Sequence, residues 1–240
     1  MASNGPGRVR RVITDRRGGA SSGDFASFNL GDHVGDAPAA VSTNRARLAR
    51  RIGLPQSDVV WMDQVHGTRI ARVTRSPGGA VPATDGLVTD RPGLALAVLT
   101  ADCVPVLAAD EVAGVIGAVH AGRKGAVAGI IPSLIGAMTS LGADAERITV
   151  LLGPAATGRH YELPDELADE VEAALPGSLT QTVAGTAGVD LRAGIKLQLA
   201  GLGVSRVDSD PRCTIAEETL FSYRRQGRTG RQASVIWRQG

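Results

Sequence analysis

The stretch LALAVLTADCVPVLAADEVAGVIGAVHAG (residues 94–122) carries three apolar segments separated by short polar joints. These segments are Leu94–Thr100, Val104–Ala109 and Val115–His120. Strands that are apolar throughout are typical of sheets covered on both faces. Because the three segments follow one another with no helix between them, the sequence predicts mixed sheets and not a strict parallel alternation.

Weaker patterns on both sides complete the expected fold. Further strands are expected at Val59–Trp61, Arg69–Val73, Thr149–Leu152, Val204–Ser209 and Ala233–Trp237. Helices are expected at Thr43–Arg51, Gly125–Met138, Asp165–Ala174 and Leu191–Leu202. Ser42 and Asp190 are expected to cap the first and last helices, with Gly53 and Gly203 just past their ends. The predicted class is α+β, with mixed β-sheets covered by helices.

The composition is that of one globular domain. The chain has 240 residues, 43% of them apolar and 21% charged, which allows a sizeable core. We expect a disordered tail over residues 1–11, which are rich in Gly, Pro, Ser and Arg, and a single domain over residues 12–240. No membrane span or signal peptide is legible, so we expect a cytoplasmic protein with no membrane partner. Both cysteines, Cys103 and Cys213, should then remain thiols.

The basic residues give little support to nucleic-acid binding. The formal charge is +2, and arginines gather at Arg8–Arg17 and Arg224–Arg231. No helix-turn-helix, finger or aromatic-basic pattern accompanies them, so no nucleic-acid partner is expected. A Walker loop is absent, and Gly201-Leu202-Gly203 lacks the third glycine of a dinucleotide motif, which removes the usual signs of ATP or nicotinamide chemistry.

Three residues of metal-binding type stand at the ends of strand segments. They lie in Asp63-Gln64-Val65-His66-Gly67, Thr100-Ala101-Asp102-Cys103 and Ala118-Val119-His120-Ala121-Gly122. Loops at strand ends are where a rigid scaffold places functional groups. We therefore expect His66, Cys103 and His120 to converge.

A thiolate and two imidazoles suit zinc or copper better than magnesium or calcium. Three protein ligands leave the fourth position of a tetrahedral site open, as in catalytic zinc centres, which favours hydrolytic or group-transfer chemistry. From spacing alone, an inert core thiol with hydrogen-bonded histidines stays an equal alternative, since no short motif such as C-x-x-C is present.

Several motifs occur in an order that resembles one family over residues 27–237. They are Phe28-Asn29-Leu30-Gly31-Asp32-His33, Gln64-Val65-His66-Gly67, Thr100-Ala101-Asp102-Cys103, His120-Ala121-Gly122, Gly153-Pro154 with Tyr161-Glu162, and Phe221-Ser222-Tyr223-Arg224-Arg225 with Thr229-Gly230-Arg231. This series resembles the YfiH/laccase-domain-containing family, whose older description is multicopper polyphenol oxidase.

The resemblance implies a YfiH-like layered sandwich with zinc held by His66, Cys103 and His120, copper being the alternative metal. It also implies phosphorolysis of adenosine, inosine and methylthioadenosine, together with deamination of adenosine. Purine nucleosides and phosphate are then the binding partners. The resemblance suggests a homodimer at most, and the sequence does not determine the oligomeric state.

The sequence departs from the family pattern at two places. Arg123-Lys124 stands where the family usually has Trp-Arg, which removes an aromatic wall and replaces an arginine fork by a lysine. Arg159-His160 stands where the family often has cysteines, so no role of those cysteines carries over.

Deamination needs a carboxylate that moves protons, for which Asp102 and Asp85 are the candidates. Asp102 directly precedes a predicted ligand, so orienting His66 or His120 is an equal alternative. Phosphorolysis needs guanidinium groups that bind phosphate. The candidates for binding substrate or phosphate are Asn29, Arg45, Arg224, Arg225 and Arg231. Solvated arginines, and a turn role for Asn29, are the alternatives. His33 is expected to be a surface histidine outside the metal set.

Three other functions fit the same residues. Cys103 could act as the nucleophile of an amidase, with a histidine as base, in peptidoglycan precursor editing. A copper polyphenol oxidase would use the same ligands, although a multicopper enzyme needs more than four histidines. A non-catalytic binding protein stabilised by zinc would need a fourth protein ligand, such as Cys213 or His33.

Overall fold

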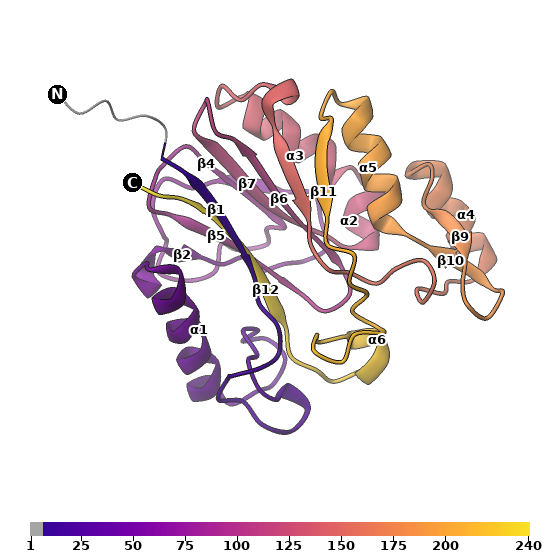
Figure 1. The fold of residues 1–240 in the computed structure, drawn as a ribbon, viewed down its shortest axis with the longest axis horizontal. Helices are drawn as coiled ribbons and strands as arrows, with labels where there is room; N and C mark the ends of the chain where they lie inside the picture. The colour runs from indigo at the N-terminus through magenta and orange to yellow at the C-terminus, as the bar shows by residue number, and fades with distance from the viewer. Residues whose placement is uncertain (1–6) are drawn as a thin grey trace.

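The computed structural model describes residues 7–240, which form two large β-sheets and a small one (Figure 1). The six-stranded sheet has the order β11-β8-β6-β7-β4-β3, the four-stranded sheet β1-β12-β5-β2, and the small sheet β10-β9. The strands are β1 Val9–Ile13, β2 Val59–Val60, β3 Ile70–Arg72, β4 Gly86–Thr89, β5 Ala95–Thr100, β6 Val104–Asp110, β7 Val115–Ala121, β8 Thr149–Leu152, β9 Leu179–Gln181, β10 Ala187–Val189, β11 Arg206–Ser209 and β12 Gln232–Arg238.

The two large sheets pack face to face, and helices cover their outer faces (Figure 1). Leu96 and Ile236 of the four-stranded sheet share a buried cluster with Leu107 and Ile116 of the six-stranded sheet. On the outer side of the four-stranded sheet, Leu48 of the first helix packs with core residues such as Trp61 and Trp237. The predicted α+β class with mixed sheets covered by helices is confirmed.

The helices lie where covering segments are needed. They are α1 Pro38–Ile52, α2 Arg123–Val127, α3 Ile130–Thr139, α4 Asp165–Ala174, α5 Leu191–Gly201 and α6 Tyr223–Gln226, with 3-10 turns at Gly23–Phe25, Gln56–Asp58 and Ala145–Arg147. Helices α2 to α5 cover the six-stranded sheet through one apolar cluster. Because every central strand is covered on both sides, its side chains are buried without alternation, as the sequence predicts.

Two helix predictions need correction. Helix α1 begins at Pro38 with Ala37 as its N-cap, so Ser42 lies inside the helix and does not cap it. Proline suits the first helical position because the amide hydrogen it lacks would have no partner there. The helix predicted at Gly125–Met138 is two helices, α2 and α3, separated at Gly129, whose φ of 95° interrupts the helix. The predicted caps Gly53, with a φ of 74°, and Asp190, which accepts from the Ala193 N–H, are confirmed.

The expectation of a disordered tail over residues 1–11 is wrong at its end. Residues 9–11 belong to β1, whose Arg10 pairs with Trp237 of β12, while residues 1–6 lie outside the described part. Pairing with β12 gives the backbone N–H and C=O groups of these residues hydrogen-bond partners, which composition does not reveal. Strand β4 and the short pair β9 and β10 were not predicted. Over residues 7–240, no helix has the length and hydropathy needed to cross a membrane.

The strands β6 and β7 run antiparallel and carry the site at one end. Val104 pairs with Ala121 at that end, and Asp110 pairs with Val115 at the other. Strand β4 pairs with β7 so that Gly86 faces Val119. The residues just before β6, just before β4 and at the end of β7 are therefore brought to one edge of the six-stranded sheet.

Candidate functional site

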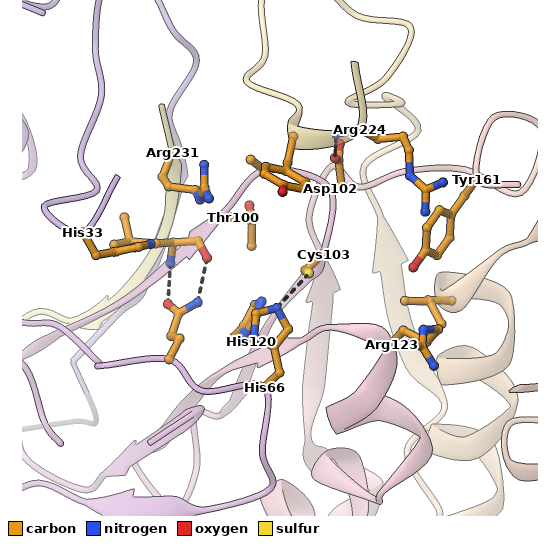
Figure 2. A pocket seen from close by; sticks show the side chains of 15 residues that line it. His33, His66, Thr100, Asp102, Cys103, His120, Arg123, Tyr161, Arg224 and Arg231 are labelled. Carbon is orange, nitrogen blue, oxygen red and sulfur yellow. Dashed lines mark hydrogen bonds between the residues drawn. The ribbon is translucent and has the colours of Figure 1, made fainter. Parts of the chain in front are cut away.

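His66, Cys103 and His120 meet at this edge of the sheet (Figure 2). Cys103 directly precedes β6, His120 is the penultimate residue of β7, and His66 lies in the turn between β2 and β3. Their potential ligand atoms all lie within 4.8 Å of one another. Cys103 Sγ is 4.0 Å from His66 Nε2, and the two imidazole rings meet edge to face with centroids 4.7 Å apart. The predicted convergence of the three side chains is thus present in the structure.

Asp85 fixes both histidines from behind the cluster. Its side chain is fully buried, and Oδ1 lies 2.9 Å from His120 Nδ1. The same carboxylate accepts hydrogen bonds from the backbone N–H groups of Val65, His66 and Gly67. With Nδ1 of His120 donating to Asp85, Nε2 is left to face the cluster, which is how carboxylates orient histidine ligands of metals.

Backbone strain is concentrated beside the cluster. His66 has a φ of 61° and Asp102 a φ of 111°, conformations that non-glycine residues rarely adopt. The His66 N–H donates to Asp85, which holds His66 in its conformation. Thr214 Oγ1 and the Arg224 N–H donate to the Asp102 carboxylate and hold Asp102 in its conformation. Strain of this kind persists where the surrounding structure enforces it, as at functional sites.

The half-buried Cys103 and the buried His120 shift each other's protonation. Burial alone would raise the pKa of the Cys103 thiol, but the neighbouring His120 and His66 outweigh it and lower that pKa to about 6. Burial alone would lower the pKa of His120, whereas the Cys103 thiolate and Asp85 raise it to about 9. Cys103 is therefore disposed to be a thiolate at neutral pH, the form that binds metal or attacks an electrophile.

The surroundings fit a metal ion. Ligand atoms around a tetrahedral zinc, bonded at about 2.0–2.3 Å, stand about 3.4 Å apart, so small side-chain movements would close the three atoms on an ion. Gly122 leaves the necessary room, because a Cβ there would stand 2.8 Å from His66 Cδ2 and 3.1 Å from Cys103 Sγ. The donor set of one thiolate and two imidazoles suits zinc or copper.

A cavity of about 310 Å³ opens in front of the cluster. Polar side chains from distant parts of the chain line it, among them His33, Asp102, Arg123, Tyr161, Arg224 and Arg231. Arg231 and His33 lie on one side of the cluster, and Arg224, Tyr161 and Arg123 on the other (Figure 2). Of the predicted residues, Asp102, Arg224 and Arg231 thus reach the cavity together with the three potential ligands.

The other predicted residues do not line this cavity. Asp85 stands behind His120, which does not support its predicted role as proton carrier. Asn29 is fully buried and joins Gly31 to Arg231 through its amide, so it acts as a turn residue. The structure therefore gives no support to its predicted contact with ribose or base, which stays a prediction.

Two predicted phosphate-binding arginines are engaged in the scaffold. Arg45 pairs with Asp32, lies over the Trp61 ring at 4.2 Å and donates to the Leu30 carbonyl. Arg225 donates to the backbone carbonyls of Thr214, Ile215, Glu217 and Leu220. Because these contacts lie in the scaffold and neither side chain lines the cavity, the structure does not support their predicted role in binding phosphate.

The sequence predicted no site role for several polar side chains of the cavity wall, among them His33, Tyr161 and Arg123. His33 was expected at the surface, and it is exposed but also lines the cavity. Tyr161 and Arg123 stand within motifs of the sequence that carry no predicted ligand. The departure at Arg123 was the available signal, since it follows directly after His120-Ala121-Gly122.

Comparison with known proteins agrees with the fold and the motifs. The family model described as multi-copper polyphenol oxidoreductase laccase matches residues 10–239. A protein of Mycobacterium tuberculosis named purine nucleoside phosphorylase is 61% identical over 96% of this chain and 92% of its own length. The crystal structure of the hypothetical protein YfiH from Bacillus licheniformis aligns with a TM-score of 0.90 at 34% identity, covering 96% of this chain and 93% of that one. YlmD from Geobacillus stearothermophilus aligns with a TM-score of 0.89 at 36% identity, covering 100% and 94%.

Proposed function

The chain belongs to the family described as multi-copper polyphenol oxidoreductase laccase, and from this membership and the cavity we propose that it is a zinc-dependent purine nucleoside phosphorylase. Several relatives that carry the name purine nucleoside phosphorylase are similar to it at up to 61% identity. The observation that carries the proposal is the His66, Cys103 and His120 cluster beside a cavity with arginines on both sides.

The proposed reaction joins phosphate to the sugar of adenosine, inosine or methylthioadenosine. An oxygen of phosphate forms a bond to C1′ of the ribose while the bond from C1′ to the purine nitrogen breaks. The purine leaves with the electron pair of that bond and takes up a proton. Arg224 and Arg231 give the cavity positive charge that attracts the phosphate anion, and Asp102 is the carboxylate on the cavity wall proposed to carry the proton.

We extend the proposal to the deamination of adenosine, in which water adds to the purine ring and ammonia leaves to give inosine. Zinc held by the three ligands would supply the Lewis-acid chemistry that activates water. Asp102 would move the proton, while Asp85 would keep His120 in the orientation that faces the cavity.

One observation favours a second function, a metal-free amidase. The lowered pKa of Cys103 beside His120 is also what a cysteine nucleophile with its base requires. Amide hydrolysis that survives removal of metal by a chelator would support the amidase. Phosphorolysis that is lost with the chelator and recovered with zinc would support the metal enzyme.

The test is an assay of inosine with phosphate, following hypoxanthine by chromatography and ribose 1-phosphate by phosphorus NMR. Cys103→Ala should abolish both products, because it removes the thiolate ligand. Cys213→Ala is the matched control, since Cys213 does not line the cavity, and it should retain activity. If the wild type leaves inosine intact, or Cys103→Ala retains activity, the proposed function is wrong.

The cytoplasmic location, the single domain over residues 12–240 and the homodimer remain predictions. They bear on the setting of the reaction and not on the residues proposed for it.

A further inference from the structure

The charges around the cavity are unbalanced. Three guanidinium groups reach it, those of Arg123, Arg224 and Arg231. Among the described residues that line it, Asp102 is the only carboxylate, and its two oxygens already accept from Thr214 Oγ1 and the Arg224 backbone N–H. A cavity with this excess of positive charge favours an anionic ligand.

The three arginines differ in how far the protein uses their donors. Arg231 Nη1 donates to the carbonyls of Thr229 and Gly230, which ties it to its own turn. Arg224 Nη1 donates to one carbonyl, that of Glu162. Within residues 7–240, Nε and Nη2 of both arginines have no hydrogen-bond partner. Over residues 7–240, the Arg123 side chain has no hydrogen-bond or ion-pair partner, although it is half-buried. A guanidinium in this state offers its planar fork to a ligand.

Arg123 and Arg224 face the same part of the cavity. Figure 2 shows the Tyr161 side chain between the two guanidinium groups, and the Arg224 guanidinium carbon lies 5.0 Å from the Tyr161 ring centroid. Burial raises the pKa of the Tyr161 hydroxyl, while the positive charges of Arg224 and Arg123 act against that rise. Both cations are thus close to one tyrosine that reaches the same cavity as the cluster.

We propose that Arg123 and Arg224, on either side of Tyr161, form the position that binds inorganic phosphate in this cavity. This inference rests on the proposed phosphorolysis and adds Arg123 to the groups that act in it. Two guanidinium forks match the oxygens of a phosphate dianion better than a single cation does. Because Arg123 follows His120 by three residues, the bound phosphate would lie beside the cluster, on the side opposite Arg231.

The first experiment measures binding without turnover. Inorganic phosphate is titrated by calorimetry into the purified, metal-containing protein and into Arg123→Gln, Arg123→Lys and Lys124→Gln. Loss of a charge-assisted hydrogen-bonding partner should weaken phosphate binding about tenfold or more in Arg123→Gln. Arg123→Lys should lie between, because lysine keeps the charge and loses the fork. Lys124→Gln is the matched control: the neighbouring residue is exposed, does not line the cavity, and should bind phosphate as the wild type does.

The second experiment separates the two substrates in steady state. Arg123→Gln should raise KM for phosphate about tenfold and leave KM for inosine unchanged. A rise in KM for inosine alone, or equal phosphate affinity in Arg123→Gln and Lys124→Gln, would overturn the proposal. Phosphate binding that depends on Arg123 in a protein that leaves inosine intact would retain this position and refute the phosphorolysis.

Discussion

Each end of the strand pair β6 and β7 has a buried aspartate that accepts several hydrogen bonds, but the two aspartates hold different partners. At one end the fully buried Asp85 lies 2.9 Å from the His120 ring, and at the other the fully buried Asp110 lies 2.9 Å from the Arg147 guanidinium. Asp85 also accepts from the N–H groups of Val65, His66 and Gly67, and Asp110 from those of Val112, Ala113 and Asp144. Hydrogen bonds from these partners lower the pKa of each carboxyl, although burial alone would raise it.

What differs is the direction in which the fourth partner faces. His120 turns its other nitrogen toward Cys103 and a cavity, whereas Arg147 lies at the surface with 38% of its side chain exposed and also pairs with Asp144. A buried carboxylate with a lowered pKa therefore does not by itself identify an active site. An active site is indicated by the groups that such a carboxylate orients toward a cavity.

A methyl group added at Gly122 would crowd the His66, Cys103 and His120 cluster without changing its charges. Gly122→Ala places a Cβ 2.8 Å from His66 Cδ2 and 3.5 Å from His120 Cε1. We expect loss of bound metal and a fall in phosphorolysis of about a hundredfold, because ligands misplaced by about 1 Å lose most of their effect.

Gly136→Ala is the control for that substitution, since a Cβ there meets nothing within 4 Å. It should keep metal content and activity, as measured by mass spectrometry and hypoxanthine release. Full activity in Gly122→Ala would show that the cluster tolerates a side chain there and that the proposed metal geometry is incorrect.

Asp85→Asn should weaken metal binding while the protein stays folded. The amide cannot accept all of the N–H groups that meet at Asp85, and it no longer holds His120 with a charge. Loss of a partner that orients a metal ligand costs about 10- to 100-fold in affinity. Competition with a chromogenic chelator measures it, and unchanged affinity would remove the positioning role of Asp85.

Asp110→Asn should produce the opposite pattern at the far end. The free energy of unfolding should fall by about 2–3 kcal/mol, because buried N–H donors and the Arg147 charge lose their acceptor. Denaturant titration measures the loss. Phosphorolysis and metal content should stay within twofold of the wild type, and a large loss of either would mean that the two ends are coupled.

The smallest effect is a pH dependence confined to the far end. The folded pKa of Asp110 is lowered from the ordinary value of 3.8, so its contribution to stability is present above that value and is lost as pH falls through the folded pKa. The difference in unfolding free energy between wild type and Asp110→Asn should therefore be constant from pH 7 to about pH 5 and shrink below pH 4. A difference that grows on acidification would contradict the sign of this linkage.

The central strands could be read from the sequence because burial on both faces leaves uninterrupted apolar runs. Thr149–Leu152 and Asp165–Ala174 match β8 and α4. The edge strands were harder to predict from the sequence. Residues 9–11 become a strand only because β12 offers them a partner more than 200 residues later in the chain, a contact that composition does not reveal.

The cluster of His66, Cys103 and His120 could be predicted because each stands at a strand end in a recognisable motif. The hydrogen-bond partners of the candidate arginines could not be predicted in this way. Whether Arg45, Arg224, Arg225 or Arg231 faces a cavity depends on which backbone carbonyls lie near each guanidinium, and those carbonyls come from distant loops. The same limitation hid the difference between Asp85, behind a histidine, and Asp102, on the cavity wall.

The proposed zinc dependence is tested most directly by the metal content of the chain purified without added metal. Mass spectrometry of the wild type, Cys103→Ala and Cys213→Ala measures zinc and copper per chain. We expect about one zinc per chain in the wild type and in Cys213→Ala, and none in Cys103→Ala. A wild type without metal, or equal zinc in all three proteins, would contradict it.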